Sequence, residues 1–260
     1  MYLQDRWAKF EKKPVIREGI IHIIFIAEII PFILLLIFIK RIKSLDMRVF
    51  FAYTLVFSLG IGLNFTFGVI LHDFILQTGL LKIMLVLEFA FISLYYTVTL
   101  KNRNWKVLIL IANLLFWGYC NRIFSVTPPD EFPRNVLAIE CLFFIVVIVY
   151  DFFEKMQQYH IVEPIYHHSS FWISVSFLIY FSGSVLLFIY YGILGKDPVF
   201  QDYFMYTYCF FAILKDLLLS VAVLVHAFVE KQEPNKNPVP VDLDLGLLNT
   251  PSRNPLTHQS

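Results

Sequence analysis

Apolar residues along this chain occur in blocks that are separated by charged or proline-containing joints. A membrane-spanning helix needs about 20 consecutive, mostly apolar residues, and the blocks have about this length. They predict seven spans, with approximate bounds 20–39, 49–71, 80–100, 106–124, 135–153, 171–194 and 203–229. We therefore expect an all-α fold: a polytopic membrane helix bundle with seven transmembrane helices over residues 19–230.

The composition also favours a membrane protein over a soluble domain. Of the 260 residues, 58% are hydrophobic and 16% are charged, and the mean hydropathy is +0.68. A soluble globular domain is about half apolar and about a quarter charged. The formal net charge is +1 and the chain has no basic run, so nothing indicates nucleic acid binding. The lipid bilayer is the partner that the composition predicts.

The two ends of the chain differ from the apolar blocks. A helix over residues 1–18 would place Leu3, Trp7 and Phe10 on one side, which predicts either a short amphipathic helix at the membrane interface or an unstructured arm. The first apolar run is too long for the core of a signal peptide, so we expect it to remain as an anchor. Residues 231–260 contain repeated Pro and Asn, which is typical of a disordered tail.

Basic residues in the short joints predict the orientation, because cytoplasmic loops carry an excess of Lys and Arg. The first and third joints hold most of them: Lys40, Arg41, Lys43, Arg48, Lys101, Arg103 and Lys106. We therefore expect these joints and the C-terminal tail in the cytoplasm and the N-terminus outside. The basic N-terminal arm argues for the opposite orientation.

The last block, YFMYTYCFFAILKDLLLSVAVLVHAFV, carries Lys215 and Asp216 near its midpoint. A charge at membrane depth costs a few kcal/mol, so it normally faces a partner, a cavity or a bound ion. Adjacent residues diverge by about 100° around a helix, so we expect Lys215 and Asp216 to be poorly placed to pair with each other. Glu28 and Glu88 lie near the centres of their own blocks, at the depth of Lys215. The pattern predicts that Lys215 pairs with Glu88 or with Glu28.

Polar residues on the expected inner faces extend this candidate site. In the second span, Gly60, Asn64 and Gly68 are spaced four residues apart and lie on one side of the helix. Tyr95 lies on the same side of its helix as Glu88. Three carboxyls and one ammonium would leave excess negative charge, so we expect protonated carboxyls or a bound cation. The candidate ligand- or ion-binding residues are Glu28, Glu88, Lys215, Asp216, Asn64 and Tyr95. The alternative is that they only form hydrogen bonds and one ion pair that hold the helices together.

Histidine placement argues against a metal site. The joint before the sixth span contains His160, Glu163 and two further histidines, but their spacing matches no zinc pattern. A seven-helix zinc hydrolase needs several histidines at one membrane level, whereas His22 and His72 are expected near the outer end and His226 near the inner end. We therefore expect no metal, no catalytic residue and no enzyme activity.

The intramembrane lysine and acid and the three cysteines do not indicate a bound cofactor. A lysine in a seventh helix and an acid in a third resemble the arrangement of retinal proteins, but the third span lacks the aspartates and threonines of that class. Cys120, Cys141 and Cys209 lie in apolar blocks, where packing residues are expected and a disulfide between Cys120 and Cys141 is the less favoured alternative. We expect no cofactor.

Two stretches resemble a known group. VLEFAFISLYYTV and FWISVSFLIYFSGSVLLFI resemble a group of small, uncharacterised seven-helix membrane proteins of Bacteroidota. The matching residues are Glu88, Trp172, Tyr180, Ser182 and Gly183. The group has an amide-rich stretch where this chain has Lys215 and Asp216, which makes a cluster around Lys215 particular to this protein. The resemblance implies a bacterial inner-membrane protein with a cytoplasmic histidine kinase as partner, and it supplies no activity.

Two functions from different classes follow from these patterns. The first is a sensory or regulatory protein with a polar intramembrane pocket that passes a signal to a cytoplasmic partner. The alternative is a small proton- or ion-coupled transporter in which Glu28, Glu88 and Asp216 exchange protons, although clear inverted repeats are missing. A structural subunit, in which the charges only hold helices together, is a third.

Overall fold

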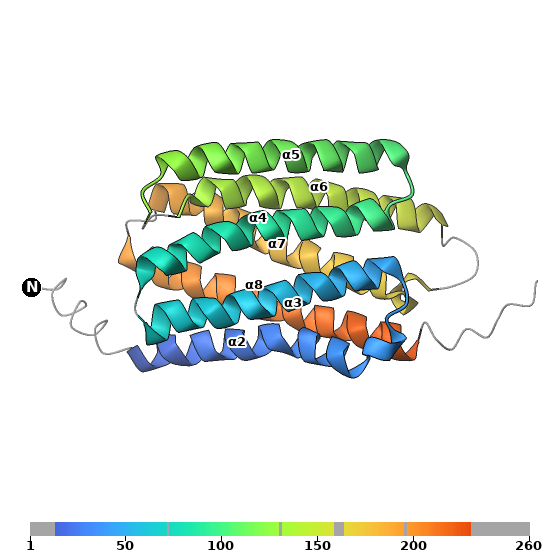
Figure 1. Cartoon of the computed structure of the whole chain (residues 1–260), viewed down its shortest axis with the longest axis horizontal. Helices are drawn as coiled ribbons and strands as arrows, with labels where there is room; N and C mark the ends of the chain where they lie inside the picture. The colour runs from blue at the N-terminus through green and yellow to red at the C-terminus, as the bar shows by residue number, and fades with distance from the viewer. Residues whose placement is uncertain (1–13, 72, 130–131, 159–163, 195–196, 230–260) are drawn as a thin grey trace, which may run out of the picture.

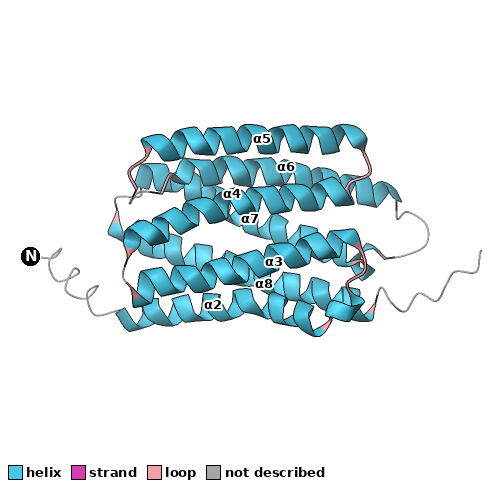
Figure 2. Ribbon diagram, in the orientation of Figure 1, coloured by secondary structure: helices cyan, strands magenta, loops and turns pink. Residues whose placement is uncertain are grey.

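The computed structural model describes residues 14–71, 73–129, 132–158, 164–194 and 197–229. Over these residues the chain forms helices and no strand (Figure 2). The long helices are α2 (Pro14–Ile37), α3 (Leu45–Phe65), α4 (Phe74–Thr99), α5 (Arg103–Val126), α6 (Arg134–Gln158), α7 (Ser169–Leu194) and α8 (Pro198–Phe228). The prediction of an all-α bundle of seven helices is confirmed. The arm up to residue 13 and the tail from residue 230 lie outside the described residues.

Six of these helices are long and apolar enough to cross a membrane, and α2 contributes a shorter apolar segment, Phe25–Ile37. The observed bounds agree with the predicted spans to within several residues, and most helices extend further. The largest extension at a C-terminal end is in α6, which continues to Gln158. Helical hydrogen bonding does not stop where the apolar residues stop, so hydropathy alone underestimates helix length.

The helices pack as long, nearly parallel or antiparallel rods (Figure 1). Helix α7 packs against α6 and α8, α8 against α2, α2 against α3, and α3 against α4. Helix α5 packs on α4 at the upper edge of the view in Figure 1. The share of buried residues in the apolar window is 50% for α7 and 17% for α5. Helix α7 is therefore enclosed, whereas α5 is peripheral.

Aromatic rings join four of the helices. The ring of Phe89 in α4 stacks on Phe116 of α5 with the centroids 3.8 Å apart, and it lies 4.9 Å from Phe144 of α6. Phe144 in turn stacks on Phe181 of α7 at 5.1 Å. Inside a bilayer, helices associate through such packing, because lipid tails remove the hydrophobic driving force between helices.

One end of the bundle carries Arg41 and Lys101, and we call it the basic end. There the Arg41 side chain caps the C-terminus of α8. The Arg41 guanidinium donates a hydrogen bond of 2.5 Å to the Ala227 carbonyl, one of the last carbonyls of α8. It also lies 5.5 Å from the ring centre of Phe38 and 5.4 Å from that of Phe228. These contacts fasten the end of α8 to the end of α2.

A glycine permits the close approach of α7 and α8. A Cβ atom added at Gly183 of α7 would lie 2.5 Å from ring atoms of Phe211 in α8. At Gly118, in the peripheral α5, an added Cβ would meet no atom within 4 Å. The two glycines therefore form a matched pair, one in a tight helix interface and one in open space.

We predict that Gly183→Ala destabilises the bundle by about 1–3 kcal/mol, because the Phe211 ring must move out of a packed interface. Gly118→Ala should leave stability unchanged or raise it by up to about 1 kcal/mol, since alanine favours the helix. Thermal unfolding in lipid nanodiscs measures both. Equal unfolding temperatures for the two variants would contradict the tight α7–α8 interface, and Phe211→Leu should partly restore Gly183→Ala.

Candidate functional site

Lys215 of α8 is buried in the middle of the bundle, with 5% of its surface exposed. Its Nζ atom lies 3.8 Å from Oε1 of Glu28 in α2 and 3.4 Å from Oδ1 of Asp216. Of the two predicted interhelical partners, Glu28 is therefore the one that forms the ion pair. The prediction that Asp216 is poorly placed to pair with Lys215 is wrong. Consecutive residues point about 100° apart around a helix, but the four-carbon lysine stem lets the ammonium reach the adjacent carboxylate.

Helix α7 also contributes to the surroundings of the lysine. The Lys215 Nζ atom lies 5.0 Å from the centre of the Tyr180 ring, within cation–π range. The Tyr180 and Tyr208 hydroxyls share a hydrogen bond of 2.9 Å, and Ser176 Oγ donates to the Lys215 carbonyl at 2.9 Å. Ser176 and Tyr180, four residues apart on one face of α7, thus both contact Lys215.

Glu88 lies near this group without an ion pair. Its residue exposure is 9%, and its carboxyl interacts electrostatically with Lys215 and Asp216 across the bundle. Among the described residues, only Glu28 and Asp216 form ion pairs with Lys215. We name Glu28, Glu88, Lys215 and Asp216 the midmembrane cluster, and it unites α2, α4 and α8.

A fourth carboxyl lies beside the cluster. Glu140 of α6 is 1% exposed, and its Oε1 atom has no hydrogen-bond partner among the described residues. It interacts electrostatically with Glu88. Oδ2 of Asp216 also lacks a hydrogen-bond partner. Three carboxyls with little exposure therefore lie near one lysine, a fourth lies beside Glu88, and hydrogen bonds and ion pairs satisfy only part of them.

Asn64 and Tyr95 do not belong to the cluster. Oδ1 of Asn64 accepts a hydrogen bond of 2.8 Å from Gln77 Nε2, and Gln77 lies about 16 Å from Glu88 along α4, by the rise of a helix. Tyr95 follows Glu88 by about 10 Å in the other direction, and its ring packs edge-on against Tyr96 at 5.2 Å. A shared helix face does not imply a shared depth, so the six candidate residues occupy three levels.

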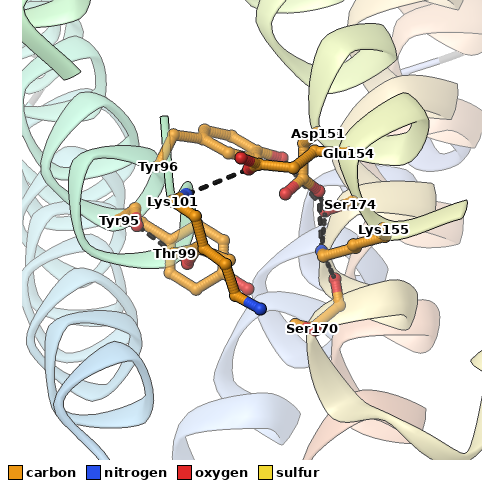
Figure 3. A network of polar contacts seen from close by, with 9 residues as sticks. All are labelled: Tyr95, Tyr96, Thr99, Lys101, Asp151, Glu154, Lys155, Ser170 and Ser174. Atoms are coloured by element: carbon orange, nitrogen blue, oxygen red, sulfur yellow. Dashed lines mark hydrogen bonds and ion pairs between the residues drawn. The ribbon is translucent and has the colours of Figure 1, made fainter. Parts of the chain in front are cut away.

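A second polar group, which the sequence analysis missed, lies near the basic end (Figure 3). Asp151 and Lys155 of α6 are 1% and 6% exposed, and Lys155 Nζ lies 2.6 Å from Asp151 Oδ2. The ammonium also donates to the Ser170 carbonyl at 3.1 Å and to Ser174 Oγ at 3.3 Å. We name Asp151, Lys155, Ser170, Ser174 and Tyr96 the basic-end network.

Ser174 of α7 connects this network to α4. Its hydroxyl donates to Asp151 Oδ2 at 2.7 Å and accepts a hydrogen bond of 3.4 Å from the Tyr96 hydroxyl. The lysine thus uses all of its N–H donors. Because its groups are matched in charge and in hydrogen bonds, the basic-end network is best explained as a fastening between helices.

The joint between α4 and α5 is tied to the same end of α6. The Glu154 carboxylate accepts a hydrogen bond of 3.0 Å from the backbone N–H group of Lys101 (Figure 3). It accepts a second one, also of 3.0 Å, from the backbone N–H group of Asn102. The Asn102 side chain donates to the Tyr150 hydroxyl at 2.9 Å, and its Oδ1 caps the start of α5. These contacts fix the basic end of three helices.

The network was missed because the predicted fifth span ended at residue 153, which placed Lys155 in a loop. Asp151 and Lys155 are four residues apart, as are Ser170 and Ser174. This spacing puts each pair on one side of its helix. Two such pairs on consecutive helices were the available signal.

Comparison of the chain with models of protein families, with curated proteins and with solved structures finds no match. Over the described residues, no three His, Cys, Asp or Glu side chains are placed to hold a metal ion, and the predicted loop residues His160 and Glu163 lie outside these residues. The three cysteines are buried and form no disulfide, in agreement with the favoured packing role. The functional argument rests on the two polar groups.

We predict that Lys215→Met destabilises the bundle by about 3 kcal/mol, because it leaves buried carboxylates without a cation. Glu28→Gln should cost less, about 1 kcal/mol, since Asp216 still faces the ammonium. In the double variant the two changes should couple by about 1–3 kcal/mol. Glu88→Gln is the matched control, because Glu88 makes no ion pair. Chemical unfolding in nanodiscs measures all four, and additive costs would refute the Glu28–Lys215 pair.

We also predict that Ser174→Ala destabilises by about 1–3 kcal/mol, because it leaves buried polar partners in the basic-end network unsatisfied. Ser182→Ala on the same helix is the control: Ser182 is exposed and bonds only its own backbone, to the Ile179 carbonyl. Its effect should stay within about 0.5 kcal/mol. Similar unfolding free energies for the two variants would show that the network contributes nothing to stability.

Proposed function

We propose that this protein is a membrane sensor or regulator whose input is proton or cation binding at the midmembrane cluster. The observation that carries the proposal is the charge imbalance: Glu28, Glu88, Asp216 and the neighbouring Glu140 accompany a single lysine. At low dielectric such an excess of acids retains protons or takes up a cation. The occupancy of the cluster then follows the conditions at the membrane face that supplies it.

The output would travel along α2 and α8 to the basic end. The cluster joins these helices at Glu28 and Lys215, and Arg41 joins them again at the Ala227 carbonyl. A change of charge in the cluster alters the force between α2 and α8, and the packed helices carry the displacement to the Arg41 contact. The basic end is the natural place for a partner to read it.

The location and the partner that we propose rest on features of the sequence. The basic joints favour a cytoplasmic basic end and an external N-terminus. The resemblance to the Bacteroidota group favours the bacterial inner membrane and a cytoplasmic histidine kinase as the receiver of the signal. In this proposal the protein is not an enzyme, because its charged groups serve occupancy and helix packing.

A proton- or ion-coupled transporter is the second candidate. The observation that favours it is the electrostatic continuity of carboxyls on three helices: Glu140 of α6 interacts with Glu88 of α4, and Glu88 interacts with Glu28 of α2. Such a row could pass a proton across the bundle. The two candidates differ in one observable, since a carrier moves its ion and a sensor only binds it.

We predict that the folded protein loses stability as the pH rises from about 5 to about 9, because the folded cluster holds protons that the unfolded chain releases. Spin labels at Ile39 and Val229, both exposed near the basic end, should report a pH-dependent distance between α2 and α8 in nanodiscs. The combined variant Glu28→Gln, Glu88→Gln, Asp216→Asn should abolish the pH dependence. The control Asp202→Asn, about 20 Å from Lys215 along α8, should retain it.

The same protein in liposomes decides between the two candidates. A sensor should leave an imposed pH gradient intact, as read by an enclosed pH-sensitive dye, whereas a carrier should dissipate it in a way that the combined variant blocks. If stability, interhelical distance and the gradient all ignore both the pH and the combined variant, the cluster is a structural clamp and both proposals are wrong.

A further inference from the structure

The polar stripe of α5 lies on the outside of the bundle. Asn113 shares its helical register with Trp117 and Asn121. In the structure Trp117 is 56% exposed, Asn121 is exposed and Asn113 is half-buried at the edge of the contact with the bundle. This stripe therefore borders the lipid instead of the interior.

Asn113 lies at the middle of the membrane. Helix α5 spans Arg103–Val126, so Asn113 follows its first residue by about 15 Å, half the thickness of the hydrocarbon. Its side chain makes no hydrogen bond to any of the described residues. Lipid tails offer no partner to a carboxamide, and an unsatisfied polar group in hydrocarbon is costly. The half-buried amide at the lipid-facing edge therefore needs a hydrogen-bond partner from outside this chain.

We propose that α5 is a self-association helix and that Asn113 pairs with Asn113 of a second copy. Two copies inserted in the same direction and related by a two-fold axis along the membrane normal bring the same residue to the same depth. A carboxamide both donates and accepts hydrogen bonds, so two asparagines facing each other form a reciprocal pair. We choose a second copy as the partner because it presents the same carboxamide at the same depth.

The residues around Asn113 suit a helix–helix contact. Leu110, Leu114, Trp117 and Asn121 lie on the same side of α5 as Asn113, at the three- and four-residue spacing of a two-helix seam. The exposed fractions of Leu110, Leu114 and Trp117 are 49%, 70% and 56%. Helix α5 has the fewest buried residues of the long apolar helices, so this side is free for a second copy. We name these five residues the α5 seam.

Disulfide crosslinking in native membranes tests the seam directly. The three native cysteines are buried, which keeps the background low. Single cysteines at Leu110, Leu114 and Trp117 should give disulfide-linked dimers under mild oxidation, because the two-fold axis brings equal positions together. Leu108→Cys and Leu115→Cys, equally exposed on the far side of α5, are the controls and should remain monomeric.

The role of Asn113 is tested by energy transfer between labelled copies at decreasing protein-to-lipid ratios. Asn113→Leu should weaken association about tenfold, the loss of one interhelical amide pair. Asn113→Gln should retain it, and Leu115→Ala should have no effect. Asn113→Leu replaces a half-buried carboxamide at the lipid-facing edge of α5 by an apolar side chain of similar size. This variant should therefore fold normally, as measured by circular dichroism. Unchanged association of Asn113→Leu, crosslinking without preference for the seam, or crosslinking only to a different protein would each overturn the proposal.

Discussion

The ammonium of Lys215 is the group on which the arrangement of this bundle depends. An uncompensated charge at this depth costs several kcal/mol, so α8 can insert only beside helices that carry the opposite charge. Glu28 gives α2 this role, and the Tyr180 ring and the Ser176 hydroxyl give α7 a complementary surface. Lys215 thus contributes a polar contact to the packing of α8 on both α2 and α7, and the close approach at Gly183 makes the α7–α8 contact tight.

The two polar groups differ in how completely they are satisfied. In the basic-end network one lysine faces one aspartate, and hydroxyl and carbonyl groups take up the remaining donors. The midmembrane cluster instead has more carboxyls than cations. Among the described residues, Oδ2 of Asp216 and Oε1 of the neighbouring Glu140 have no hydrogen-bond partner. A matched network resists change, whereas an unmatched one changes its charge when a proton or a cation arrives. The unmatched cluster lies at midmembrane and the matched network lies at the basic end of the bundle.

Sequence reasoning was reliable where one property decides the outcome. The length of the apolar blocks predicted the seven helices. The cost of a buried charge limited the interhelical partner of Lys215 to Glu88 or Glu28, of which Glu28 forms the ion pair. It failed where two helices must be placed relative to each other. Tyr95 shares a face with Glu88 but not a level, and Lys155 appeared to be in a loop because hydropathy ends before the helix does. The direction in which α5 faces was also beyond reach, since periodicity identifies a stripe but not what that stripe meets.

The position of α5 links the outer seam to the cluster through a single aromatic stack. Phe116 of α5 lies against Phe89, and Phe89 is adjacent to Glu88 in the helix that carries the unpaired carboxylate. Phe89 also contacts Phe144, one turn after Glu140 in α6. A second copy held on α5 would therefore lie next to α4, the helix that carries Glu88. In the proposed dimer, the Phe116–Phe89 stack is the contact through which a change of charge at Glu88 would reach the α5 seam, because close-packed rings have low compressibility.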